Sequence, residues 1–221
     1  VAYSALTESI AAFEQTPEFA PFDSKYDRYL RGEYFYDPLS KAAEGKGLFF
    51  SQQFTNCATC HQLKPNSHRQ ELFTSHEYHN IGVPVNQAVR AINSKGGDFV
   101  DQGLMDNPQI TDASARGKFK VPTLRNIAVT APYMHNGVFK RLSTVIQFYD
   151  HYLTNSEFTI NPETGDAWAA PEVPENISLT ELEDGKKLTP EKVEAMVCFL
   201  YTLTDARYEH LIPTDGPDCG E

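Results

Sequence analysis

The segment 57–61 constrains this chain more than any other, because Cys57 and Cys60 have two residues between them and His61 follows directly. In the C-x-x-C-H pattern of c-type haem attachment, two thiols one helical turn apart add to the vinyl groups and the histidine faces the iron. A zinc site would need a second ligand pair at close spacing, and Cys198 and Cys219 are far apart in sequence. A redox dithiol would lie in a βαβ context, whereas helix and loop patterns surround this motif. The motif therefore predicts one covalently bound haem c with His61 as the proximal iron ligand.

The two remaining cysteines, Cys198 and Cys219, fit either a disulfide or two separate thiols, and their spacing does not decide between these. Thioether attachment of haem takes place outside the cytoplasm, where a disulfide would tie the C-terminal tail to the last helix. For the same reason we expect a periplasmic or otherwise exported protein. The chain begins at Val1 without a basic and then apolar leader, so we expect any export signal to have been removed or never included.

The net charge argues against nucleic-acid binding, and the hydropathy argues against a membrane-spanning helix. The formal net charge is −11 at pH 7, whereas nucleic-acid binding requires clustered Lys and Arg. We therefore expect no nucleic-acid partner, while a basic redox protein would be steered to the chain electrostatically. The longest apolar run, residues 195–201, is much shorter than the about 20 residues that a transmembrane helix needs, so we expect no membrane span.

Helical periodicity recurs in five segments, and none of the chain alternates clearly as a strand would. The predicted helices cover residues 4–13, 24–30, 39–50, 142–153 and a last helix that begins after Thr189. Thr189 is the expected N-cap of the last helix, with Pro190 at its first position, and we expect this helix to pack near the one before Cys57. Residues 62–120 lack periodicity and predict long loops over the haem face. The predicted fold class is therefore mostly α, a c-type cytochrome fold with long loops and little or no β.

The group on the other side of the iron decides the chemistry. Methionine keeps the haem potential high, an anionic oxygen lowers it, and an open position admits peroxide or a gas. Composition leaves several histidines and three other candidates for this sixth ligand, namely Met105, Met134 and Tyr149. Tyr149 recurs at helical spacing with three apolar residues, Leu142, Val145 and Ile146. Periodicity thus favours Tyr149 as inward-facing, although an ordinary buried aromatic would show the same spacing.

Residues 120–137 read K-V-P-T-L-R-N-I-A-V-T-A-P-Y-M-H-N-G, and H-N-I-G occupies positions 79–82. Together with the C-x-x-C-H motif upstream, this run resembles the C-terminal haem domain of the bacterial dihaem cytochrome c peroxidase and MauG family. The similarity covers roughly residues 39–205 and is far more specific than the haem motif alone. It implies a cytochrome c-like domain that transfers electrons within a peroxidase-type oxidoreductase.

The resemblance also implies ligands. In the family, the sixth ligand of this haem falls fourteen residues after the histidine of P-Y-x-H-x-G, as methionine or tyrosine, and counting from His135 reaches Tyr149. Met134 is the alternative ligand within the motif itself. A calcium site between two haem domains is implied as well, with the backbone carbonyls of Thr130 and Pro132 as ligands, although Thr-Ala-Pro also fits an ordinary turn.

Several polar side chains are further candidates for the site. Arg125, together with Asn126, is expected to contact haem propionates or the domain interface, since arginine forms paired bonds to a carboxylate. His135 and His79 would assist proton transfer in an enzyme, or they would bond propionates or backbone. Trp168 lies in a polar, proline-rich excursion at 154–188 that is expected to carry little of the core. We expect Trp168 to pack under a loop, with electron hopping or protein contact as alternatives.

One departure from the family pattern shapes the functional hypothesis. Family members carry two C-x-x-C-H motifs, and this chain carries one. We expect a helical interdomain segment at 1–38, the haem domain at 39–210 and a tail at 211–221. The leading hypothesis is an electron-relay domain of a MauG-like or cytochrome c peroxidase-like system. The peroxidatic haem would lie on another domain or chain, and a redox protein would be the electron donor or acceptor.

Two alternatives stay open. The chain would be a self-contained monohaem peroxidase if peroxide reacted at its own iron. It would be a non-enzymatic haem module, for gas sensing or assembly, if a small gas or a larger complex were its ligand. Carbon monoxide binding to the reduced chain distinguishes the gas-binding module from the electron relay, because it requires an open or weakly held sixth position at the iron.

Overall fold

The computed structural model describes residues 2–63 and 71–220, and its fold is mostly helical with long loops, as the sequence predicts. The helices are α1 (Ala2–Glu14), α2 (Lys25–Leu30), α3 (Lys41–Phe50), α4 (Cys57–Cys60), α5 (Gln87–Ile92), α6 (Leu142–Asp150), α7 (Leu179–Leu182) and α8 (Pro190–Tyr201). Short 3-10 turns lie at Leu104–Asp106, Ala113–Ala115, Ile127–Val129 and Ala206–Leu211. Within the described ranges, the named strands are β1 (Tyr78–His79) and β2 (Phe119–Lys120), which pair antiparallel with Tyr78 opposite Lys120.

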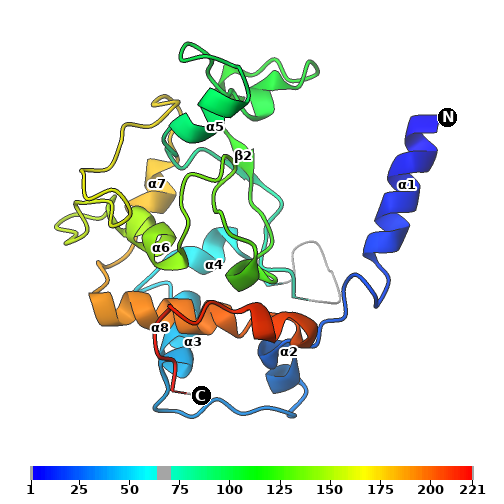
Figure 1. Cartoon of the computed structure of the whole chain (residues 1–221), viewed down its shortest axis with the longest axis vertical. Helices are drawn as coiled ribbons and strands as arrows, with labels where there is room; N and C mark the ends of the chain where they lie inside the picture. Colours follow the sequence, from blue (N-terminus) through cyan, green and yellow to red (C-terminus); the bar gives the residue numbers. More distant parts are fainter. Residues whose placement is uncertain (1, 64–70, 221) are drawn as a thin grey trace.

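The centre of the fold is the packing of α3 against α8 (Figure 1). Thr189 caps α8 by accepting a hydrogen bond from the Lys192 backbone N–H, and Pro190 takes the first helical position, as predicted. Ser40 caps α3 in the same way through the Ala43 N–H. The expectation that the last helix packs near the helix before the haem motif is confirmed. Helix α8 is buried on more than one face, because other elements besides α3 pack against it. Its seven buried side chains are those of Val193, Ala195, Met196, Val197, Cys198, Phe199 and Leu200.

Helix α6 ends at Asp150, three residues before its predicted end. The Asp150 carboxylate accepts hydrogen bonds from the Leu188 backbone N–H at 2.6 Å and the Ser156 hydroxyl at 2.6 Å. Asp150 is buried, so these partners satisfy a carboxylate that would otherwise lack its solvent shell. The chain therefore leaves the helix at Asp150 and its next loop folds back onto this side chain.

The sequence predicts that the excursion 154–188 contributes little to the hydrophobic core. This prediction is wrong for three side chains. Val173, Leu182 and Leu188 are buried. Trp168 donates its indole N–H to the Phe158 carbonyl at 2.6 Å and packs edge-on against buried aromatic rings, which agrees with a packing role under a loop. Prolines and polar residues do keep this segment irregular, but its scattered apolar side chains still reach the core.

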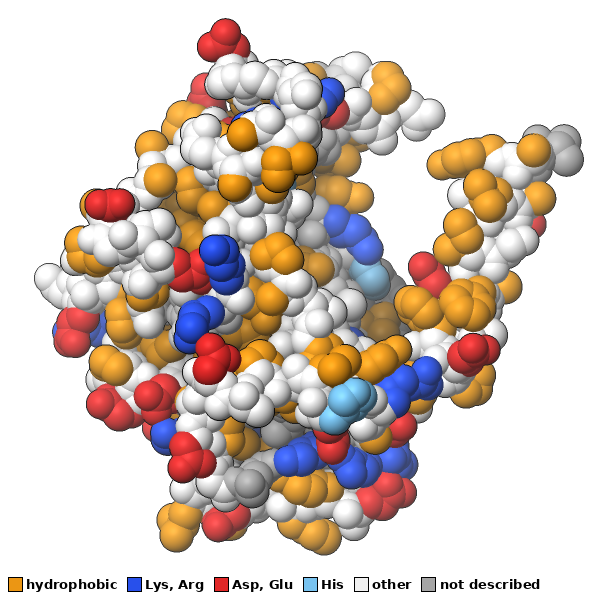
Figure 2. Space-filling view, in the orientation of Figure 1, with side chains coloured by type: hydrophobic (Ala, Val, Ile, Leu, Met, Phe, Trp, Pro, Cys, Tyr) orange, Lys and Arg blue, Asp and Glu red, His pale blue; other side chains and the backbone are white. Residues whose placement is uncertain are grey.

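Helix α1 lies apart from the rest of the chain (Figure 1). The predicted helix is present, but none of its residues is buried. Leu6, Ile10 and Phe13 share a face and each is about half exposed, and Figure 2 shows hydrophobic side chains along this helix. Periodicity predicted the helix, but it could not show that the apolar face of this helix stays about half exposed.

A disulfide joins Cys198 in α8 to Cys219 near the C-terminus, with 5.5 Å between the two Cα atoms. This decides between the two options that the spacing left open. The bond ties the tail to the last helix and agrees with an oxidising compartment. No helix in the described part of the chain has the length and apolar character needed to cross a bilayer.

Candidate haem site

Cys57 and Cys60 form one short helical turn, α4, and neither takes part in a disulfide. The His61 backbone N–H donates to the Cys57 carbonyl at 2.9 Å, and the Ser75 N–H donates to the Cys60 carbonyl at 2.8 Å. Burial, with smaller contributions from nearby carboxylates, raises the pKa of Cys60 to about 11. Reactive dithiols have lowered thiol pKa values, so this environment argues against the redox-dithiol alternative.

The ring of His61 is oriented by a backbone carbonyl. Its Nδ1 lies 3.0 Å from the Phe73 carbonyl oxygen, which can only accept a hydrogen bond. Nδ1 must therefore carry the proton, and Nε2 keeps the lone pair that an iron ion requires. Burial lowers the pKa of His61, which favours this neutral form. The carbonyl of Phe73 is a positioning group that no sequence pattern identified.

A cavity of about 590 Å³ adjoins the motif, a volume in the range typical of cofactor pockets. Its lining is mostly apolar and comes from α3, α6, α8 and the loop 117–135, and it includes Phe49, Val121, Leu124, Ile127, Tyr133, Ile146, Met196 and Leu200. Cys57, Cys60 and His61 also line it. An apolar cavity of this size with two thiols and a neutral imidazole at one wall fits a covalently attached haem.

The predicted face of α6 opens onto the same cavity. Leu142, Val145, Ile146 and Tyr149 all line it. Tyr149 lines the cavity together with Cys57 and Cys60 and is 36% exposed. Desolvation and these two thiols raise the pKa of its phenol. Met134 lines the cavity too, with a left-handed backbone (φ 68°), whereas Met105 lies in the 3-10 turn Leu104–Asp106 outside the lining.

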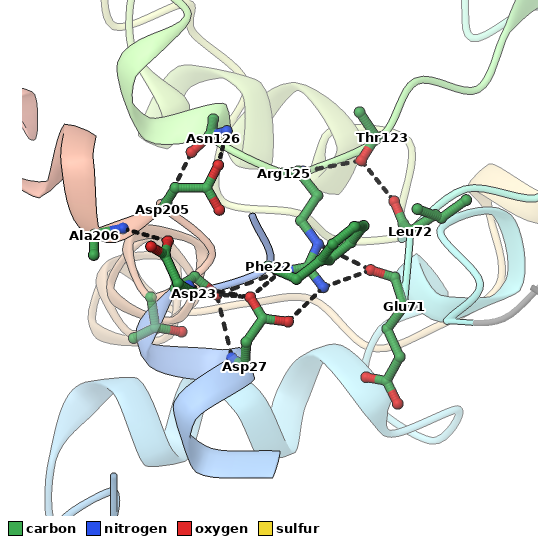
Figure 3. A network of polar contacts seen from close by, with 12 residues as sticks. Phe22, Asp23, Asp27, Glu71, Leu72, Thr123, Arg125, Asn126, Asp205 and Ala206 are labelled. Carbon is green, nitrogen blue, oxygen red and sulfur yellow. Dashed lines mark hydrogen bonds and ion pairs between the residues drawn. The ribbon is translucent and has the colours of Figure 1, made fainter. Parts of the chain in front are cut away.

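Arg125 borders the cavity, but its paired hydrogen bonds go to a protein carboxylate (Figure 3). Its two terminal nitrogens lie 2.5 and 2.8 Å from the two carboxylate oxygens of Asp27. The guanidinium also donates to the Glu71 carbonyl, from Nε at 2.9 Å and from Nη2 at 2.7 Å. Asp27 and the Glu71 carbonyl thus hold the guanidinium at the border of the cavity. Asp27 lies 98 positions away in sequence, and no local pattern could have found it.

Asn126 joins the same region to the end of the chain. Its side-chain amide donates to the Asp205 carboxylate at 2.9 Å and accepts from the Asp205 backbone N–H at 2.8 Å. Figure 3 shows this pair beside the Arg125–Asp27 pair. Together they hold the loop after β2 against α2 and the segment that follows α8. Arg125 and Asn126 therefore make structural contacts within the chain, and their contact with a propionate or a domain interface stays a prediction.

His135 and His79 both line the cavity. His135 is exposed, and its ring stacks on Phe119 with centroids 3.5 Å apart and planes 7° from parallel. Partial desolvation of the ring lowers its pKa. His79 places Nδ1 3.2 Å from the Ser178 hydroxyl, while its buried Nε2 has no hydrogen-bond partner among the described residues and lies 3.7 Å from the Glu77 carboxylate. A buried polar atom at a cofactor cavity suits a propionate oxygen, so His79 fits the haem edge.

Thr130 and Pro132 line the rim of the cavity and are exposed. Neither is near a carboxylate cluster: in the described ranges no group of three or more His, Cys, Asp or Glu side chains could hold a metal ion. A calcium ion at this rim would thus depend on backbone carbonyls and on ligands from elsewhere.

The chain was compared with protein-family models, with curated proteins and with solved structures. No protein-family model matches the chain. The chain is 50% identical over 213 residues to the methylamine utilization protein MauG of Paracoccus denitrificans, which covers 96% of this chain and 54% of that protein. It is 30% identical over 155 residues to the cytochrome c551 peroxidase of Nitrosomonas europaea, covering 69% of this chain and 39% of the peroxidase.

Among solved structures, the chain resembles the diheme peroxidase BthA from Burkholderia thailandensis, with a TM-score of 0.71 and 29% sequence identity. That match covers 97% of this chain and 54% of the peroxidase. The chain therefore spans about half the length of MauG and of this peroxidase.

Proposed function

Because the chain belongs to the MauG and bacterial cytochrome c peroxidase family, we propose that it is the electron-transfer haem domain of such a protein. The peroxide-reacting haem would lie on another domain or chain, as the half-length match to relatives suggests. The observation that carries this proposal is the apolar cavity that is lined by both the C-x-x-C-H motif and Tyr149.

Each residue of the site has a distinct part in this proposal. Cys57 and Cys60 hold the haem through thioether bonds, and His61, oriented by the Phe73 carbonyl, binds the iron on the proximal side. Tyr149 supplies the sixth ligand. When bound, the haem supplies a reversible one-electron couple, and an anionic oxygen ligand favours its oxidised forms. A filled sixth position keeps peroxide away from this iron, which suits a relay.

The remaining parts of the proposal concern the surroundings of the site. We assign the haem domain to 39–210, in the C-terminal position of a dihaem protein, and the segment 1–38 to the side that faces the other haem domain. A redox protein exchanges electrons with this haem in an exported location. The Thr130 and Pro132 carbonyls contribute to a calcium site completed by the other half. His79 and His135 contact the haem edge.

The Tyr149→Phe variant tests the sixth ligand. Removing the phenol oxygen is expected to change the ferric optical spectrum from six-coordinate with an oxygen ligand to five-coordinate or water-bound, because phenylalanine has no ligand atom. The matched control is Tyr152→Phe, three positions away, whose hydroxyl donates to the Ile81 carbonyl. It should leave the spectrum unchanged.

Two results would contradict the assignment of Tyr149. One is an unchanged six-coordinate spectrum in Tyr149→Phe. The other is a spectral change in Met134→Leu instead, which would make Met134 the ligand. The reduced haem-loaded chain should also bind carbon monoxide poorly and turn over peroxide slowly. Rapid peroxide turnover would favour the monohaem peroxidase, and tight carbon monoxide binding would favour a gas-binding module.

A further inference from the structure

Tyr26, in α2, lies directly behind the proximal side of the haem site. It is 3% exposed, although it lies outside the cavity lining. Its ring packs edge-on against Phe73, with centroids 5.2 Å apart and planes at 72°. The Phe73 carbonyl accepts the hydrogen bond from the ring of His61 at 3.0 Å. One residue therefore separates a buried phenol from the proximal iron ligand.

The hydroxyl of Tyr26 is hydrogen-bonded to the side chain of Glu71. A carboxylate can accept a proton, so this pair differs from a tyrosine that donates to a backbone carbonyl, such as Tyr152 with Ile81. Burial and the Glu71 carboxylate raise the pKa of Tyr26, which keeps the phenol protonated at neutral pH. A phenol loses an electron far more readily when its proton can leave at the same time, and Glu71 is placed to receive it.

A row of tyrosines continues from Tyr26 towards the surface. The ring centroids are 6.5 Å apart for Tyr26 and Tyr29, 5.0 Å for Tyr29 and Tyr36, and 5.2 Å for Tyr36 and Tyr34. These separations are those of aromatic rings in contact. Tyr29, Tyr34 and Tyr36 are partly exposed. The row thus connects the proximal side of the haem with the surface of α2 and the loop that follows it.

We propose that Tyr26 is a redox-active residue that gives one electron to the haem after a peroxide has oxidised the haem system. The Tyr26 O–H bond breaks, the proton moves to the Glu71 carboxylate, and the electron passes to the haem, which is reduced by one equivalent. Tyr26 is left as a neutral phenoxyl radical. An electron from Tyr29, together with the proton held by Glu71, restores the Tyr26 phenol, and the partly exposed Tyr29 releases its own proton to solvent. The same exchange between Tyr29 and Tyr36 moves the oxidising equivalent towards the surface. The inference rests on the proposed function for the presence of an oxidised haem.

The test uses the haem-loaded chain oxidised by photogenerated tris(bipyridine)ruthenium(III), a one-electron oxidant that needs no open position at the iron; the sample is then frozen rapidly and examined by electron paramagnetic resonance. The wild-type chain should show a tyrosyl radical, identified by the change in hyperfine pattern after labelling with ring-deuterated tyrosine. Tyr26→Phe keeps the ring and removes the hydroxyl, so most of this signal should disappear. Glu71→Gln keeps a hydrogen-bond acceptor but removes the base, and it should weaken the signal.

The matched control is Tyr152→Phe, which should retain the full radical yield. An undiminished signal in Tyr26→Phe, or the absence of any tyrosyl radical in the wild-type chain, would overturn the inference. If Tyr26→Phe folds poorly, Glu71→Gln still tests the inference. An unweakened radical signal in Glu71→Gln would contradict the role of Glu71 as proton acceptor. The relay proposal is judged separately by the ferric spectrum of Tyr149→Phe, so it would survive a negative radical experiment.

Discussion

The Gly45→Ala variant is expected to lose about 3 kcal/mol of folding free energy, at the upper end of the cost of overpacking a core. Gly45 lies where α3 crosses α8, and a Cβ there would come within 1.9 Å of the Ala195 carbonyl oxygen and 2.5 Å of its carbon. Both atoms are backbone, so no rotamer change relieves the clash, and the two helices must separate. Thermal unfolding of the haem-loaded chain should show a midpoint lower by about 6–12 °C.

Gly47→Ala is the matched control in the same helix. A Cβ at Gly47 meets nothing within 4 Å. Alanine favours a helix over glycine by about 1 kcal/mol, so this variant should be as stable as the wild type or more so. If both variants melted alike, the close approach of α3 and α8 at Gly45 would not be the reason for the glycine.

Replacing Arg125 with methionine is expected to cost about 3–5 kcal/mol, because it leaves a buried carboxylate without its partner. The side chains of Arg125 and Asp27 are 10% and 7% exposed, and two hydrogen bonds join them. The loss should also loosen the loop after β2 and lower the yield of haem-loaded chain. Chemical denaturation followed by far-ultraviolet circular dichroism measures the stability, and haem absorbance measures the yield.

Two further variants make this measurement specific to the buried pair. Arg116→Met removes an arginine whose partner, Glu175, lies 3.2 Å away, but these side chains are 38% and 56% exposed. Such surface pairs contribute about 1 kcal/mol or less, so this variant should be nearly neutral. The double variant Arg125→Met with Asp27→Leu should recover part of the lost stability, because the unpaired charge is gone. A loss as small in Arg125→Met as in Arg116→Met would contradict the role of the buried pair.

Much of the candidate site could be predicted because its chemistry is encoded at short range. The C-x-x-C-H motif is five consecutive residues, and one helical turn aligns its two thiols. The stripe that ends at Tyr149 follows from helical periodicity, and its four side chains do line the cavity. The cap of α8 at Thr189 depends on residues within one turn. Such features are decided by neighbours in sequence, so pattern analysis can reach them.

Other parts of the site are decided between distant segments. Arg125 forms paired hydrogen bonds to Asp27, and only the packing of α2 against the loop after β2 brings these two residues together. The proton of His61 is placed by the carbonyl of Phe73, and a backbone carbonyl carries no pattern of its own. The hydrogen bond between Tyr26 and Glu71 likewise depends on two segments that meet only in the fold.

The sequence by itself indicated the haem-attachment motif, the mostly helical fold, and the face of α6 that lines the same cavity as this motif. The tertiary structure decided that Cys198 pairs with Cys219, that the excursion 154–188 contributes Val173, Leu182 and Leu188 to the core, and that α1 keeps its apolar face exposed. The physical reason is range. Periodicity, caps and attachment motifs depend on residues a turn or two apart, whereas burial and pairing depend on which distant surfaces the whole chain brings into contact.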